Sequence, residues 1–247
     1  MAGHSKWANI KRKKGVVDAR RGKIFTKLVK EITISSRLGG PDPEANARLR
    51  LAVQNARGAN MPKDTIERAI KKGAGSDGTE YIELTYEGYG LHGVAVFIEC
   101  TTDNLNRTVQ NIRVAFSKYG GNLGTNGSLE FIFTRKGIFT FPVPEQTDEE
   151  SFTLDMIDAG AEDVEFSDGY VTVTCPLQEF GNIQKAIDAK GIEPENAGLQ
   201  RIPNTYVYLT DEELQRVMKL IEALEDDDDV QKVYHNIEIT EEQMALI

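Results

Sequence analysis

Cysteine, histidine and tryptophan are scarce in this 247-residue sequence, which has two, three and one of them. Cys100 and Cys175 stand 75 residues apart, with no CxxC pair and no histidine at metal-ligand spacing. The sequence therefore excludes a disulfide framework and a thiolate zinc site. Both cysteines end apolar, strand-like runs (VAVFIEC and YVTVTC), so we expect two buried structural thiols.

Long apolar segments are also missing. No run approaches the roughly 18 residues that a membrane-spanning helix needs. The N-terminus carries charge but has no apolar stretch of the kind found in secretory signals behind it. We expect a cytoplasmic protein without a membrane partner.

Motifs of enzymes are missing as well. His92 and His235 lie far from any nucleophile signature, and the loop GGNLGTNGS (120–128) lacks the Lys-Ser/Thr ending of a phosphate-binding loop. We therefore expect no enzymatic activity, cofactor, metal or small-molecule substrate, although a catalytic Cys100 or Cys175 stays open. The acidic run 225–229 could hold a divalent cation, but five consecutive acids favour a solvated turn.

Acidic residues are nearly missing from the first thirty positions, which contain one acid, Asp18, and ten lysines and arginines. Residues 1–72 hold 18 Lys and Arg against 6 Asp and Glu, whereas residues 73–247 hold 11 against 33. Clustered cations gain by displacing counterions from phosphates, so this division predicts a nucleic-acid partner. The alternative is a solvated helical face, but such faces usually mix the two signs.

The predicted nucleic-acid contacts in this basic segment are eight cations and one indole. They are Lys6, Trp7, Lys11, Arg12, Lys13, Lys14, Arg20, Arg21 and Lys23. Trp7 could stack on an unpaired base or pack on the helices behind it, and the sequence supports both readings. Residues 1–17 contain few large apolar groups, so we expect this arm to be mobile until it binds.

Three helices are predicted after the arm. The first begins at Asp18 and ends at the Gly39-Gly40 pair. The second begins at Asp42-Pro43-Glu44 and reaches Ala56, and the third begins at Asn60-Met61-Pro62 and stops at Gly73. The small-residue stretch 73–79 then marks a domain boundary.

Strands and helices alternate in the acidic body. Strand patterns at 81–90 and 93–101 form a hairpin, and a helix follows at 103–119. Apart from its cap this helix has no acid, and we expect Asn104, Arg107, Asn111 and Lys118 to face outward. Arg107 is thus a tenth predicted nucleic-acid contact, whose replacement should weaken binding without disturbing the core, unless this is an ordinary exposed helix.

The remaining segments predict two α+β domains, one nested in the other. After the strand LEFIF (129–133), residues 135–203 follow the ferredoxin-like order βαββαβ, with a capping box at Thr147 and Glu150. The strand TYVYL (205–209), a helix capped by Thr210 with Glu213, and a strand at 230–237 complete a second such unit around it. The fold class is α+β, with a helical domain (1–78), a middle domain (79–134 plus 204–247) and an inserted domain (135–203).

Four stretches resemble the YebC/PmpR family: GHSKWANIKRKK near the N-terminus, NMPKDTIERAIKKG at 60–73, YEGYGLHGVA at 86–95 and TDNLNRTVQNIR at 102–113. The departures are small, namely Arg12 where a histidine is common and Leu105 where a polar residue is frequent. The resemblance implies a three-domain cytoplasmic protein. Bacterial members are generally labelled DNA-binding transcriptional regulators, but similar proteins include a mitochondrial translational activator and relatives linked to stalled ribosomes. The implied partner is therefore DNA, or ribosomal RNA within the ribosome.

Overall fold

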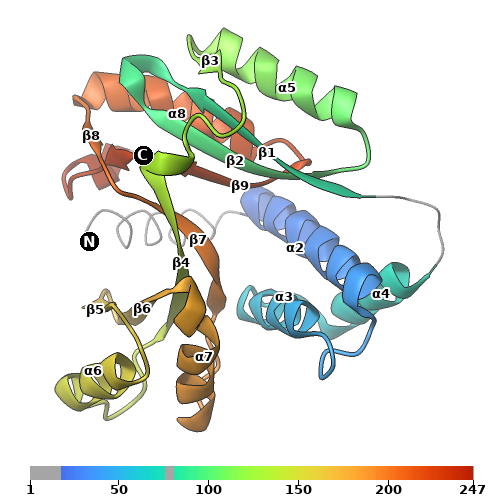
Figure 1. Cartoon of the computed structure of the whole chain (residues 1–247), viewed down its shortest axis with the longest axis vertical. Coiled ribbons are helices and arrows are strands. Elements are labelled where there is room, and N and C mark those ends of the chain that lie inside the picture. The colour runs from blue at the N-terminus through green and yellow to red at the C-terminus, as the bar shows by residue number, and fades with distance from the viewer. Residues whose placement is uncertain (1–17, 76–80, 247) are drawn as a thin grey trace. The chain divides into compact units, whose positions relative to one another are not determined.

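The computed structural model describes residues 18–75 and 81–246, which form an α+β protein (Figure 1). The chain divides into two compact units. Of the described residues, unit 1 contains 18–27, 81–134 and 202–246, and unit 2 contains 28–75 and 135–201. The chain leaves unit 1 after Thr134 and returns at Ile202, so one α+β domain is inserted into the other. The domain limits 1–78, 79–134 plus 204–247, and 135–203 stay predictions.

Three helices form the N-terminal part of the described chain. They are α2 (Asp18–Gly39), α3 (Ala47–Gly58) and α4 (Lys63–Ala74). The predicted start of the second helix at Asp42 is wrong. Asn46 provides the cap instead, because its side chain accepts a hydrogen bond from the Leu49 amide, while the Asp42 carboxylate accepts one from the Glu44 amide in the preceding turn.

The predicted third helix is confirmed as α4, which ends at Ala74, one residue beyond the predicted stop at Gly73. Gly73 is buried where α4 crosses α2, and a Cβ there would lie 2.3 Å from the Thr33 carbonyl oxygen. Ser36 donates a hydrogen bond of 2.8 Å to the Ile70 carbonyl at the same crossing. This glycine permits a close helix approach rather than ending a helix.

A four-stranded antiparallel sheet forms the centre of unit 1, in the order β3-β1-β2-β9. The strands are β1 (Ile82–Tyr89), β2 (Ala95–Thr102), β3 (Asn122–Leu123) and β9 (Val230–His235). The predicted hairpin is confirmed, since β1 and β2 pair along their whole length around the turn Leu91–Gly93. Side chains of β2 alternate between the two faces of this sheet.

Two helices, α5 (Leu105–Lys118) and α8 (Asp211–Glu225), provide the core of unit 1 with the sheet. Val96, Ile98 and Cys100 of β2 meet buried side chains of both helices. Ala95 and Phe97 belong to a separate cluster with Leu129, Ile132, Phe133 and Tyr234. The capping box of Thr210 and Glu213 at the start of α8 is confirmed. Burial on both faces thus fixes the register of this sheet.

The inserted domain has the ferredoxin-like strand order β5-β6-β4-β7. Its elements are β4 (Phe133–Pro142), α6 (Glu149–Asp158), β5 (Asp163–Ser167), β6 (Tyr170–Pro176), α7 (Phe180–Ala189) and β7 (Asn196–Pro203). Phe152 and Met156 of α6 and Ile183 and Ile187 of α7 join one buried cluster with the strands. The cap of α6 is Asp148 rather than the predicted Thr147, whose hydroxyl donates to the Pro144 carbonyl.

Two predicted strands of the middle domain are wrong. In LEFIF, Glu130–Ile132 is a 3₁₀ turn, and Phe133 already begins β4 of the inserted domain. From TYVYL only β8 (Val207–Tyr208) forms, and it pairs in parallel with β10 (Ile237–Glu238) outside the main sheet. Instead, β1 lies beside β2 and β3 forms the edge of the main sheet, because the hairpin brings β1 next to β2 without a long connection.

Within unit 2, α3 lies against the edge strand β7. The Asn55 amide nitrogen donates to the Ala197 carbonyl and its oxygen accepts from the Ala197 amide, both at 2.8 Å. Leu51 packs on the core of the inserted domain, and a Cβ on Gly58 would lie 2.0 Å from the Glu195 carbonyl oxygen. The Asn55 side chain therefore satisfies backbone groups of β7 as a neighbouring strand would.

Candidate nucleic-acid interface

The predicted basic arm lies outside the described residues. Lys6, Trp7, Lys11, Arg12, Lys13 and Lys14 all belong to it, so their roles stay predictions. Arg20 and Arg21 lie in the first turn of α2, but their side chains are outside the description too. The first described side chain of the predicted interface is therefore Lys23.

Two lysines of α2 already have partners in unit 1. The Lys23 ammonium lies 2.6 Å from an Asp226 carboxylate oxygen, and Lys27 donates a hydrogen bond of 2.8 Å to the Glu225 carbonyl. The Lys23 and Asp226 side chains are 44% and 64% exposed. An ion pair this open to water contributes only about 0–1 kcal/mol, so Lys23 can exchange its partner for a phosphate at little cost.

Sequence reasoning missed further cations on α4. Ile66, Ala69 and Gly73 are its buried positions, so Arg68, Lys71 and Lys72 lie together on the exposed side. Arg68 shares an exposed ion pair with Asp64, whereas Lys71 and Lys72 make none with any described residue. The helical spacing of the three buried residues could have indicated the exposed side of α4 from the sequence, but it was used only to predict the helix.

Arg107, the tenth predicted contact, does not face solvent freely as the sequence suggested. Its Nη2 lies 2.8 Å from each carboxylate oxygen of Asp229 and 2.8 Å from Asp103 Oδ1, and its Nε lies 3.0 Å from Asp229 Oδ2. These hydrogen bonds, first that to Asp229 and then that to Asp103, raise the pKa of the guanidinium. Arg107 thus fastens α5 to the acidic segment before β9.

The acidic run 225–229 is correspondingly not a simple solvated turn. Asp229 is only 2% exposed and also accepts a hydrogen bond of 2.9 Å from the Thr108 hydroxyl. Asp227 accepts bonds from the Asn111 amide and from the Asp229 backbone amide. The last acids of the run therefore hold α5 in place, which a charge count along the chain cannot reveal.

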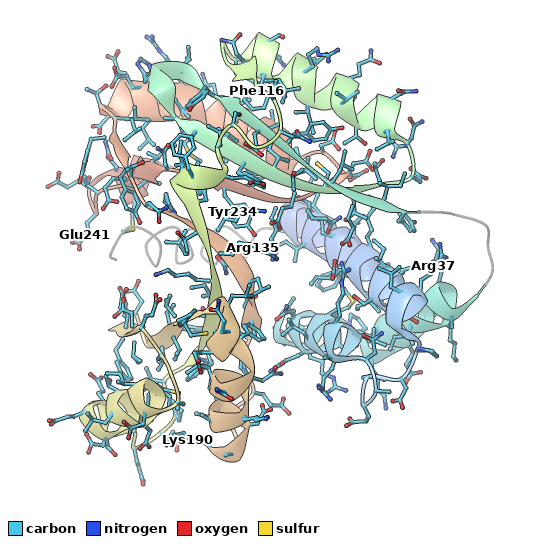
Figure 2. The ribbon with its side chains drawn as sticks, in the orientation of Figure 1. Arg37, Phe116, Arg135, Lys190, Tyr234 and Glu241 are labelled. Carbon is cyan, nitrogen blue, oxygen red and sulfur yellow. The ribbon has the colours of Figure 1, made fainter. Side chains whose placement is uncertain are left out.

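Asn104, Arg107, Asn111 and Lys118 of α5 are exposed, as predicted, but three of them are engaged in contacts. The cap is Asn104, whose side chain accepts from the Arg107 amide, while Asn111 and Arg107 contact the acidic segment. Thr108, Ile112 and Phe116 are buried, and Phe116 lies between the helix and the sheet (Figure 2). The exposed side chains opposite them are Asn106, Gln110, Arg113, Val114 and Ser117.

The described ranges also include both cysteines and His92. Neither cysteine is in a disulfide and both are buried, which confirms the expected structural thiols, and burial raises the pKa of Cys175 to about 11. His92 lies 3.2 Å from Glu213 in a half-exposed pair. Between residues 18–75 and 81–246, no three His, Cys, Asp or Glu side chains group as metal ligands.

The described helices also include none with both the length and the low polarity that crossing a bilayer requires.

Comparison with known proteins gives the family. A model described as the TACO1/YebC protein N-terminal domain matches residues 5–76, and one described as the TACO1/YebC second and third domain matches residues 81–237. Proteins named "Probable transcriptional regulatory protein" are similar along almost their whole length. One from Amoebophilus asiaticus is 56% identical over 96% of this chain and 98% of its own. One from Syntrophotalea carbinolica is 51% identical over 100% and 99%.

A solved structure is similar as well. The crystal structure of a conserved hypothetical protein from Aquifex aeolicus matches with a TM-score of 0.81 and 43% identity, covering 91% of this chain and 93% of that one. The two proteins therefore share the α+β fold. On these matches, the chain belongs to the TACO1/YebC family.

Proposed function

We propose that this protein is a non-enzymatic, nucleic-acid-binding regulator whose basic N-terminal segment supplies most of the binding free energy. The observation that carries the proposal is the division of charge, 18 cations against 6 acids in residues 1–72 and 11 against 33 in the rest. Phosphate contacts from such a segment give affinity without sequence preference. The acidic remainder repels nucleic acid over most of its surface, which favours binding at the basic part.

The proposed contacts are Lys6, Trp7, Lys11, Arg12, Lys13, Lys14, Arg20, Arg21 and Lys23. Arg107 leaves this set, because its guanidinium is held by Asp229 and Asp103. The exposed Lys71 and Lys72 of α4 join it as further cations on the helical part. Their role would be to extend the phosphate contacts of the arm along the helices.

Duplex DNA is the first candidate partner, with a role in regulating transcription, since the similar proteins carry that name. Ribosomal RNA is the second, with a role in helping the ribosome translate difficult sequences. The observation that favours RNA is Trp7, an indole placed among cations, because unpaired bases in folded RNA stack on aromatic rings. Duplex DNA offers no such exposed base faces.

The experiment is to capture the intact protein from a lysate at moderate salt beside a variant lacking residues 1–17. The intact protein should retain nucleic acid, as discrete DNA fragments for the first candidate and as ribosomes for the second. The variant should lose both while keeping its melting temperature nearly unchanged, since a terminal arm contributes little to stability. A variant that retains as much nucleic acid as the intact protein would contradict the proposal.

A further inference from the structure

Residues 104–129 form a continuous segment without acid inside an acidic unit. The stretches 81–134 and 202–246 together hold seventeen Asp and Glu against six Lys and Arg, yet none of those acids lies between positions 104 and 129. This segment comprises α5, the short strand β3 and the loop that leads to Leu129. The uneven placement gives unit 1 one surface that does not repel phosphate.

Apart from Leu105 and Val114, the exposed side chains of this segment carry hydrogen-bonding groups. On one side of α5 and in the loop beyond it these groups are amides, a hydroxyl and one guanidinium. Each amide can both donate and accept hydrogen bonds. We call the set the acid-free surface: Asn106, Gln110, Arg113 and Ser117 of α5 with Asn122 and Asn126 beyond it. The four α5 residues lie at i, i+4, i+7 and i+11, which places them on one side of the helix.

Charge on this surface is not cancelled from within the unit. Arg113 makes no ion pair with any described residue. Lys118 lies over the Tyr119 ring, 5.2 Å from its centroid, which leaves its charge intact. By contrast, Arg107 is neutralised by Asp229 and Asp103 at the flank of the helix. The network around Asp229 thereby holds α5 rigidly while leaving its outer side for a partner.

We infer that the acid-free surface binds single-stranded nucleic acid, which deepens the proposed function by assigning unit 1 its own contact. Arg113 would meet a phosphate, and the Asn and Gln amides would reach the edges of unpaired bases. A duplex fits less well, because it carries one phosphate charge per about 1.7 Å and would bring two strands toward the surrounding acids. A single strand has a lower charge density and can follow the surface alone.

The first test places a photo-crosslinking amino acid at Gln110 of the full-length protein. A matched control carries it at Gln215, an exposed glutamine of the same unit on the acidic helix α8. The probes are a uridine-rich RNA of about 20 nucleotides, longer than the roughly 4–16 that comparable sites cover, the DNA strand of matching sequence, and the corresponding duplex. We expect Gln110 to crosslink both single strands about tenfold more than Gln215 does, corresponding to about 1.4 kcal/mol, and the duplex far less.

The second test replaces Arg113→Glu and, as a control with the same charge change, Arg216→Glu on α8. Arg216 is 64% exposed and has only a 3.9 Å contact with Glu212. Arg113→Glu should weaken single-strand binding about 5- to 30-fold, and Arg216→Glu should change it less than twofold, while both variants unfold at the temperature of the parent.

Equal crosslinking at the two positions, or stronger crosslinking to the duplex, overturns the inference. If the probes still bind in a salt-dependent way in that case, the basic arm and the proposed function stand without it. If the intact protein binds none of the three probes at low salt, the inference and the proposed function both fall.

Discussion

At the scale of single residues, Arg107 is the side chain whose role changes most between sequence and structure. Its charge suggested a nucleic-acid contact, but it is the counter-ion of Asp229, which is almost fully buried. A carboxylate removed from water needs such a partner, since an unpaired buried charge is costly. We therefore expect Arg107 to contribute to stability.

Replacing Arg107 with alanine should lower the free energy of unfolding by about 1–3 kcal/mol, since the buried Asp229 carboxylate loses its guanidinium partner. Urea unfolding followed by circular dichroism measures this loss. The matched control is Arg113→Ala on the same helix, for which we expect a change within about 0.5 kcal/mol. Equal, small losses for both variants would show that the ion pair is not stabilising.

Gly73 offers a second test at this scale. Gly73→Ala should destabilise the protein by about 1–3 kcal/mol, because the new methyl group would meet the Thr33 carbonyl oxygen at 2.3 Å and force α4 away from α2. Gly22→Ala is the control, in a helix where a Cβ has no neighbour within 4 Å, and it should stabilise by up to about 1 kcal/mol. Thermal unfolding of both variants measures these changes. An unchanged melting temperature for Gly73→Ala would contradict a tight crossing of α4 and α2.

Cys175 makes stability depend on pH at the alkaline end. Burial raises the thiol pKa from an ordinary 9.0 to about 11, so the folded protein holds this proton more tightly than the unfolded chain. The resulting stabilisation is complete below pH 9 and is lost as the pH rises toward about 11. The free energy of unfolding should fall across this window, and less steeply in Cys175→Ala. Identical slopes for the two proteins would contradict a buried, neutral thiol.

At the scale of elements, α3 and the edge strand β7 provide the clearest prediction. Asn55→Ala removes both hydrogen bonds to the Ala197 backbone, so the Ala197 amide should exchange with deuterium about tenfold faster, which corresponds to about 1.4 kcal/mol of local opening. Hydrogen exchange with mass spectrometry measures this for the peptide that contains β7. Asn111→Ala, which removes one exposed hydrogen bond to Asp227 in the other unit, should leave that peptide unchanged.

Local signals in the sequence were sufficient for most elements. The capping box of Thr210 and Glu213, the hairpin of β1 and β2 and the ferredoxin-like order after Lys136 all follow from turn residues and apolar spacing within short windows. The segment LEFIF has the apolar pattern of a strand, but the same pattern also suits a turn. In the structure Leu129 and Ile132 are buried and Phe131 is exposed. Similarly, TYVYL has strand propensity, but β1 already occupies the place beside β2.

The errors at the candidate interface have a different cause. Arg107 and Asn111 are exposed as predicted, but their partners in the acidic run lie more than a hundred residues away, and no periodicity within the helix contains them. Gly73 was predicted only as a helix stop, whereas the Thr33 carbonyl of α2 comes close to it. Such contacts belong to tertiary packing, which a single sequence does not display.

At the scale of the whole molecule, the charge division remains the main argument for function. The basic residues are concentrated before position 73 and the acids after it, and within the acidic part the stretch 104–129 is spared. This arrangement suits a protein that holds a polyanion by one segment while its remaining domains contact only selected parts of the same partner.

The most direct test of this account is the dependence of binding on salt. Eight cations lie from Lys6 to Lys23, and if about six of them meet phosphates, log K against log salt should have a slope near −5 on duplex DNA and near −4 on a single strand. Replacing Lys11, Arg12, Lys13 and Lys14 together with alanine should reduce the slope by about three to four. Trp7→Ala should weaken single-strand binding by about 1–3 kcal/mol at an almost unchanged slope, because stacking releases no counterions. A slope near zero for the intact protein would contradict the electrostatic account.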